Sequence, residues 1–247
     1  CEAIEVFFEV LNNWYIRRSR ARFWGAEVND DKIQAYNTLY TCLVTMCKAA
    51  SPLLPLMTEE IYKGLTGEES VHLSNFPEFD FNEDGDLVTN MDLVRDICNT
   101  ALSLRNDVKI RIRQPLSDIT LYGDNYSQNK GLFLQFEGII KDEINVKSVQ
   151  LEDLTDEIGK HVLRINSPVL GKRLKSEGKQ GLMKDIISGS KQGKWQQEAG
   201  KVSIAGEALN NDEFTLGLEA TNAETTRELK TGGVLLELNT EISSELY

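Results

Sequence analysis

Residues 13–24 read NWYIRRSRARFW and continue an apolar helical pattern that begins near the start of the chain. The stretch holds four arginines and four aromatic residues, a dense mixture for a chain whose net charge is -12. Upstream apolar residues recur every three or four positions, at Ile4, Phe7, Phe8, Leu11 and Tyr15. This spacing predicts one helix that buries a single face and ends at Gly25.

The arginines at the far end of this helix require partners outside it. Arg18 and Arg22 continue the apolar face, and burying an unpaired guanidinium costs several kcal/mol. No acidic residue lies between Glu9 and Glu27 to neutralise them. The charge pattern leaves two alternatives, a solvated helix end paired with distant acids or a contact with nucleic acid.

Three more amphipathic helices are predicted before residue 108. Residues 29–31 can cap the second helix, which keeps its helical period until Ser51-Pro52 ends it. A third helix runs to about Leu65, with Gly64 or Gly67 as its stop, and an acidic loop follows over residues 67–86. The buried face of the fourth comprises Met91, Val94, Ile97, Cys98, Ala101 and Leu104. Together they predict an antiparallel four-helix bundle over residues 1–107.

The pattern changes from helical to alternating at Val108. Three apolar residues face one way and three cations the other, which predicts extended chain with a basic face formed by Lys109, Arg111 and Arg113. Strands near residues 119–122 and 144–151, with a helix near 132–141 between them, complete a predicted α/β unit over residues 108–153.

Residues 154–247 are predicted to form a mixed α/β region. Strands are expected near residues 161–165, 202–205, 213–219 and 234–238, and helices near 170–176 and 181–187. The glycine-rich residues 188–193 are predicted to be a loop without the residue order of a phosphate-binding loop. The predicted fold class is therefore α+β, with an N-terminal helical bundle followed by small mixed α/β subdomains.

The charges lie in blocks of one sign. Residues 59–96 contain eleven acids and two bases, whereas residues 160–201 contain ten bases and three acids. After Lys201 nine acids face two bases. Although the net charge alone argues against nucleic acid, such blocks can steer a polyanion to one face, with binding that is local and sensitive to salt.

Several sequence motifs resemble one enzyme family. The string NNWYIRRSRARFW at residues 12–24 is similar to the segment that opens the anticodon-binding helical bundle of isoleucyl-tRNA synthetases, a class I family. ASPLLPLMTEEIY at residues 50–62, SVHLSNFP at 70–77 and RIRQPL at 111–116 resemble further signatures, in the family's order and spacing. LGKRL at 170–174 and LELNTEISSEL at 236–246 resemble its C-terminal extension more loosely.

The resemblance implies a parent enzyme that uses ATP and Mg to activate isoleucine and charge tRNA(Ile), while this part holds the anticodon stem-loop. Neither a HIGH-like nor a KMSKS-like signature is present, so the chain itself is predicted to be a non-catalytic fragment without a cofactor. The rest of the synthetase chain is then its second partner. The alternatives are the same module of a valyl or leucyl relative, which the NWYIRR and RxRQPL strings disfavour, and a scaffold that binds an acidic protein.

A single-stranded anticodon loop offers bases to aromatic planes and phosphates to cations. Predicted tRNA contacts fall in three patches, namely Trp14, Arg17, Arg18, Arg20, Arg22 and Trp24, then Lys109, Arg111 and Arg113, and finally Lys172, Arg173 and Lys175. Core packing competes with base stacking for the aromatics, and Tyr15 is expected to point inward. Arg111 and Arg113 could instead pair with acids of the bundle. The third patch, with Lys179, is expected to be a solvated helix face.

No catalytic or metal site is predicted. Cys42, Cys47, His72 and Cys98 lack the spacing of a zinc site and are expected to be buried small side chains or turn residues. His161 is predicted to be a half-exposed strand residue, and the neighbours Glu59-Glu60 and Asp142-Glu143 to be solvated helix faces. With neither a membrane-spanning stretch nor a signal peptide in the sequence, and a cysteine pattern that suits a reducing compartment, a cytoplasmic location is predicted.

Overall fold

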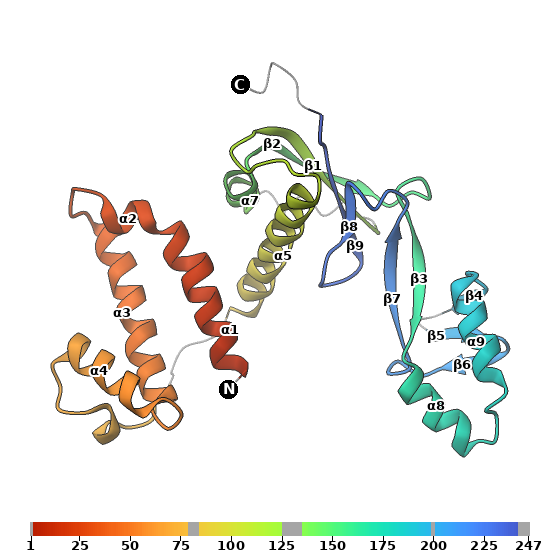
Figure 1. Cartoon of the computed structure of the whole chain (residues 1–247), viewed down its shortest axis with the longest axis horizontal. Coiled ribbons are helices and arrows are strands. Elements are labelled where there is room, and N and C mark those ends of the chain that lie inside the picture. The colour runs from red at the N-terminus through yellow and green to blue at the C-terminus, as the bar shows by residue number, and fades with distance from the viewer. Residues whose placement is uncertain (1, 79–83, 125–134, 199–200, 242–247) are drawn as a thin grey trace. The chain divides into compact units, whose positions relative to one another are not determined.

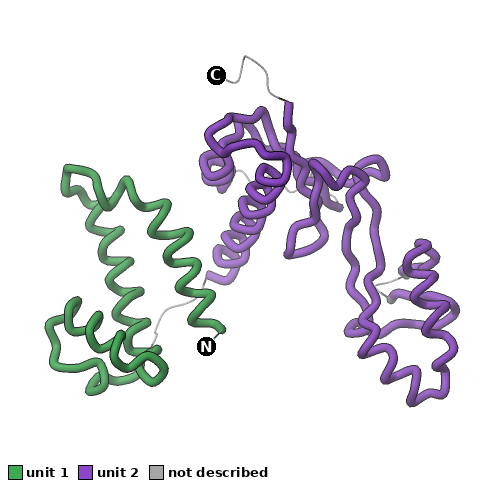
Figure 2. Tube along the Cα trace, viewed as in Figure 1, with its two compact units in different colours: residues 1–83 green, residues 84–247 purple. Residues whose placement is uncertain are grey.

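The structure, a computed structural model, describes residues 2–78, 84–124, 135–198 and 201–241. It divides into two compact units, residues 1–83 and residues 84–247 (Figure 2). The predicted 132–141 helix, the acidic loop and the 236–246 string each fall partly outside the described residues. The boundaries predicted at residues 107 and 153 differ from this division and stay predictions.

Unit 1 is helical in its described part (Figure 1). Its elements are α1 (Glu2–Val10), a π-helical turn η1 (Leu11–Ile16), α2 (Arg20–Trp24), α3 (Asp30–Ala50), α4 (Pro55–Thr66) and a 3-10 turn η2 (Val71–Leu73). The single first helix predicted from the sequence is therefore three pieces. A π-helical turn is wider than an α-helical one, so it rotates the residues that follow away from the earlier apolar face.

Local sequence signals set the ends of the next two helices as predicted. The Asn29 side chain accepts a hydrogen bond from Lys32 N at 2.9 Å and caps α3. Pro55 occupies the first turn of α4, and Gly67 ends it in the left-handed conformation, with φ 72° and its N–H donating to Lys63 O. The buried cluster between α3, α4 and η2 is small, with Cys47, Tyr62 and Val71 at its centre.

Unit 2 begins with α5 (Gly85–Asp107), which packs against a four-stranded sheet and α7 (Glu137–Ile144). The sheet order is β2 (Val146–Asp153), β1 (Leu116–Gly123), β9 (Val234–Leu238) and β8 (Thr226–Glu228). β1 and β2 are parallel and joined through α7, whereas β9 pairs antiparallel with both β1 and β8. The α/β unit predicted after residue 108 is confirmed in its strands, and β9 joins it from the far end of the sequence.

The predicted four-helix core is not confirmed. Val94, Ile97 and Leu104 are buried as expected, but α5 packs within unit 2, against β8, β9 and α7. An amphipathic pattern predicts that one face of a helix is buried. It does not predict whether another helix or a sheet packs against that face.

The second part of unit 2 is connected through a two-stranded antiparallel ribbon of β3 (Gly159–Ile165) and β7 (Phe214–Ala220). Residues 166–213, here named the inserted module, lie between these strands and hold α8 (Ser167–Ser176), α9 (Leu182–Lys191), β4 (Trp195–Glu198), β5 (Lys201–Ile204) and β6 (Glu207–Leu209) (Figure 1). Leu170, Leu174, Ile186, Val202 and Ile204 form its core.

The sequence predicted most of these elements but missed the short strands β4, β6 and β8. The loop expected at residues 188–193 is also wrong, because α9 continues to Lys191. A glycine at position 189 of that helix is explained by packing, because a Cβ there would lie 3.1 Å from the Ile204 side chain.

Candidate nucleic-acid interface

The arginine segment, residues 13–24, is anchored by two of its aromatics. The Tyr15 hydroxyl donates to Ala35 O at 3.0 Å, and the Tyr15 ring meets Phe23 edge-on. Phe23 is buried and also contacts the Tyr36 ring. Tyr15 therefore points inward as expected, and core packing accounts for both residues.

The two tryptophans lie differently. The Arg18 guanidinium lies 5.4 Å from the ring centre of half-buried Trp14, and that of Arg20 lies 5.6 Å from the ring centre of Trp24. Trp24 is 77% exposed, so Arg20 and Trp24 form a cation–π pair whose apolar plane faces water. An exposed aromatic plane with an adjacent cation can stack on a base and attract its phosphate.

Arg17 and Arg22 are tied to the protein. Arg17 Nε donates to Asn13 O at 2.7 Å. Arg22 Nη2 lies 2.8 Å from Asp31 Oδ1, and its Nε donates to Asp31 Oδ2 at 2.9 Å. The hydrogen bond that Arg22 donates to Asp31 raises the pKa of Arg22 above its ordinary value. For Arg22, the alternative of a helix end paired with a distant acid is the one observed.

The second patch has a different conformation from the one predicted. Residues 108–115 form a turn-rich loop, here named the cationic loop, and Lys109 has φ 60° instead of an extended angle. The alternation of apolar and basic residues fails as a strand signal because the chain here has no strand to pair with. Backbone hydrogen bonds inside the loop, from Ile110 N to Arg105 O and from Gln114 N to Arg111 O, hold the turn instead.

Arg105, which the sequence did not indicate as a site residue, is buried and holds this loop by hydrogen bonds to its backbone. Its side chain is 2% exposed, and its guanidinium donates to the carbonyls of Arg111 (3.3 Å), Gln114 (3.0 Å) and Asn145 (3.0 Å). Burial lowers the pKa of Arg105 from its ordinary value. A sequence signal existed, because Arg105 follows Cys98 and Ala101 at helical spacing on the buried face of α5.

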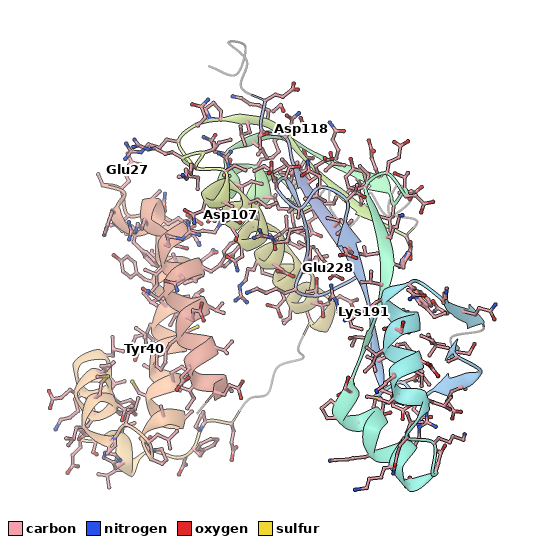
Figure 3. The ribbon with its side chains drawn as sticks, turned by 45° about the vertical axis from the view of Figure 1, so that its right-hand side comes forward. Glu27, Tyr40, Asp107, Asp118, Lys191 and Glu228 are labelled. Carbon is pink, nitrogen blue, oxygen red and sulfur yellow. The ribbon has the colours of Figure 1, made fainter. Side chains whose placement is uncertain are left out.

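The loop presents its own cations to solvent. Lys109, Arg111 and Arg113 are exposed, and within the described residues none of them has an acid within 4.0 Å. The nearest candidate in sequence, Asp107, is occupied by Arg227 Nη2 at 2.7 Å (Figure 3 labels Asp107). Among the described residues of unit 2, Arg111 and Arg113 therefore have no acidic partner, and their suggested pairing with acids of the bundle stays a prediction.

The third patch needs a correction at Arg173. Its guanidinium donates to Glu213 (2.5 and 3.0 Å), Glu207 (2.9 Å) and Glu177 (3.3 Å), and Glu213 is 1% exposed. Lys179 also binds Glu207 at 3.0 Å. The solvated face predicted for this patch is thus wrong for Arg173, because β6 and the residues before β7 bring acids onto the helix, whereas Lys179 is paired but exposed. Lys172 and Lys175 are exposed.

The cationic partners of Glu207 and Glu213 favour the ionised form of both carboxyl groups. Burial opposes ionisation of Glu213, but hydrogen bonds from Arg173 and from Asn210 N outweigh it and lower its pKa. Hydrogen bonds from Lys179 and Arg173 lower the pKa of Glu207. The cluster therefore stabilises the inserted module, and its carboxylates neutralise the charge of Arg173.

Other predicted side chains have structural roles. Glu59 is not a solvated face, because its Oε2 accepts hydrogen bonds from Ser70 Oγ (3.0 Å) and Val71 N (2.9 Å), which lower its pKa. Glu143 is 6% exposed and is likewise no solvated face. His161 is half-exposed as predicted, 3.4 Å from Asp124 Oδ1.

The cysteines follow their expected burial. Cys47 is buried and Cys42 half-buried, and burial raises the pKa of both thiols. Cys98 is buried on α5. Among the described residues, no group of three or more His, Cys, Asp or Glu side chains is placed to hold a metal ion.

Residues 1–120 match the model of a family described as the anticodon-binding domain of tRNA ligase. The whole chain is also similar to curated proteins. It is 44% identical to the isoleucine–tRNA ligase of Rickettsia bellii (strain OSU 85-389) over 268 residues, which cover 99% of this chain and 23% of that protein. Over nearly its whole length, the chain is therefore similar to one part of isoleucine–tRNA ligases. The relatives from Rickettsia akari (strain Hartford), at 41%, and Wolbachia pipientis wMel, at 39%, align over 99% and 100% of this chain.

The chain spans about a quarter of the length of these relatives, since the aligned parts cover 23%, 25% and 24% of them. The matched family domain includes the arginine segment and the cationic loop, and the inserted module lies outside it. In the described ranges, no helix has the length and apolar content that a membrane span requires.

Proposed function

We propose that this chain binds the anticodon stem-loop of tRNA(Ile) and is the tRNA-binding part of an enzyme that charges that tRNA with isoleucine and ATP. The exposed Arg20–Trp24 pair carries the proposal, because it lies in the matched anticodon-binding domain and has no role in the core of unit 1. Trp14 with Arg18 supplies a second, half-buried pair of the same kind.

The chemistry of an anticodon loop fits these groups. Its unpaired bases can stack on an indole plane, and its phosphates can bind guanidinium groups. Isoleucine is favoured over valine or leucine because the relatives compared are isoleucine–tRNA ligases at 39–44% identity. In this proposal the chain itself is non-catalytic and holds no cofactor, while ATP and Mg act elsewhere in the whole enzyme.

A fluorescence-anisotropy titration tests this function. The chain is titrated with an isoleucine tRNA, a valine tRNA and an isoleucine tRNA with altered anticodon bases, at two salt concentrations. Preference for the unaltered isoleucine tRNA is the expected result. Equal binding to all three that vanishes with salt would contradict anticodon reading, and preference for an acidic protein over RNA would support the scaffold alternative.

The second proposed partner is the rest of the synthetase chain. Leu56, Met57 and Leu73 are 85%, 62% and 72% exposed, and His72 Nε2 lies 3.3 Å from Pro55 O, which places η2 beside the first turn of α4. Such a contiguous apolar surface is typical of a contact site. Because the relatives are about four times longer than the aligned part, we assign this surface to another segment of the same polypeptide.

A photo-crosslinking residue that replaces Leu56 of this chain, placed within the full-length synthetase, tests this assignment. A crosslink to another segment of the same polypeptide is expected, and a crosslink to a second copy would contradict it. The proposal also includes a cytoplasmic location, the compartment of such an enzyme, and a helical anticodon-binding bundle built from residues 1–107.

A further inference from the structure

The cationic loop is held in a fixed shape that aims positive charge outward. Arg105 binds the carbonyl oxygens of Arg111 and Gln114 on the inner side of the loop. Asn145 adds a clamp, because its Nδ2 donates to Ile112 O at 2.8 Å while its own carbonyl accepts from Arg105 and from Leu116 N. With the carbonyls turned inward, the loop holds Lys109, Arg111 and Arg113 on an exposed surface.

The positive charge of this loop is not neutralised nearby. In the described ranges, Lys109, Arg111 and Arg113 lack an acid within 4.0 Å, and Asp107 pairs with Arg227. Arg105 adds a fourth charge beneath them, with backbone carbonyls as its hydrogen-bond acceptors and its Nε buried without a partner among the described residues. A buried guanidinium that binds only dipoles keeps its charge, so its field reaches the surface above.

We propose that the cationic loop is a second RNA contact that binds backbone phosphates, and that Arg105 is its positioning residue. The inference rests on the proposed function, and it deepens it by naming a sequence-independent site on unit 2, whereas the arginine segment belongs to unit 1. Guanidinium and ammonium groups on a rigid loop suit phosphate because little side-chain and backbone freedom is lost on binding. Bases are not read there, since the described residues of the loop include no aromatic side chain.

The test compares the salt dependence of isoleucine-tRNA binding by the intact chain and by the double variant Arg111→Gln, Arg113→Gln. Two lost phosphate contacts lower the slope of log K against log salt by about 1.4 to 1.8. Between about 50 mM and about 200 mM salt, the intact chain should therefore lose roughly tenfold more affinity than the variant. The preference among anticodons should not change, because phosphates carry no sequence information.

A matched control removes the same charge elsewhere. Lys184→Gln with Lys191→Gln removes two exposed lysines of α9, outside the matched family domain. An unchanged slope in this control supports the site, and equal slope changes in both double variants would overturn it. Loss of poly-glutamate binding with unchanged RNA binding in the Arg111/Arg113 variant would assign the loop to an acidic protein and also overturn it.

Arg105 is tested through the same slope. Arg105→Met should lower it to the value of the Arg111/Arg113 variant, whereas Arg105→Lys, which keeps the charge and part of the hydrogen bonding, should restore part of it. A merely structural role would lower stability and leave the slope of the folded fraction intact, and that result would overturn the positioning role. Failure of the intact chain to bind any tRNA would instead overturn the proposed function itself.

Discussion

The arginine segment and α8 are both rich in basic residues, yet they use their arginines in opposite ways. Arg173 in α8 donates to three carboxylates, one of them on the buried Glu213. Arg20 in α2 lies over the exposed ring of Trp24. Two of these acids, Glu207 and Glu213, come from 34 and 40 residues away in sequence. A basic run is therefore informative about RNA only after the acids that fold onto it are known.

The largest expected effect is on the α8 side of this comparison. Arg173→Met should lower the free energy of unfolding of the inserted module by about 3 kcal/mol, because it leaves the buried Glu213 carboxylate without its cation. Urea unfolding followed by Trp195 fluorescence, in a background with Trp14→Phe and Trp24→Phe, measures it. The control Lys175→Met changes an exposed residue and should shift stability by less than about 0.5 kcal/mol. Equal effects of the two substitutions would show that Arg173 is an ordinary surface residue.

Acid should break the same cluster. Hydrogen bonds from Arg173 overcome the burial of Glu213 and lower its pKa, so its folded pKa lies below its unfolded value of about 4.3. The resulting stability is complete above that unfolded value and is lost as the pH falls through the folded pKa. Urea midpoints measured from about pH 7 to about pH 3 should therefore fall on acidification.

The variant Arg173→Met should reverse that sign. With the cation gone, burial raises the pKa of Glu213 against the hydrogen bond from Asn210 N, so protonation relieves a buried charge and acid stabilises the variant relative to neutral pH. Parallel pH profiles for the two proteins would mean that Glu213 does not depend on Arg173.

These two regions also show how far the sequence could predict the fold. Signals carried by neighbouring residues succeeded, such as the Asn29 cap and the Gly67 stop, because their hydrogen bonds close within a few residues. The helical stripe of α5 was predicted too, but its partner was not, since a stripe has the same period against a helix or a sheet. The extended chain predicted from Val108 was wrong, because alternating apolar and basic residues form a strand only where a neighbouring strand pairs with them.

The candidate site divides in the same manner. The exposed pair Arg20 and Trp24 lies four residues apart in a helix, so its contact follows from local spacing. The role of Arg105 depends on Asn145, 40 residues away, and no local pattern contains that contact. What sequence reasoning lacked was the long-range partner of each cation.

On the arginine-segment side, the double variant Arg20→Ala, Trp24→Ala should weaken tRNA binding by about 1 to 3 kcal/mol through lost base stacking and phosphate attraction. Its stability should stay close to that of the intact chain, because Trp24 is 77% exposed. Anisotropy titration measures the first and urea unfolding the second. Unchanged affinity in the folded variant would remove α2 from the interface.

The smallest effect is expected at Arg22, and it sharpens the comparison because Arg22 is paired as Arg173 is. Its partner Asp31 is 61% exposed and the Arg22 side chain 35% exposed, whereas the Glu213 side chain is 1% exposed. Water therefore solvates either charge when the other is removed, so Arg22→Ala should cost at most about 1 kcal/mol. A double-mutant cycle with Asp31→Asn measures the coupling. A value as large as that of Arg173 with Glu213 would mean that burial does not set the difference between the two regions.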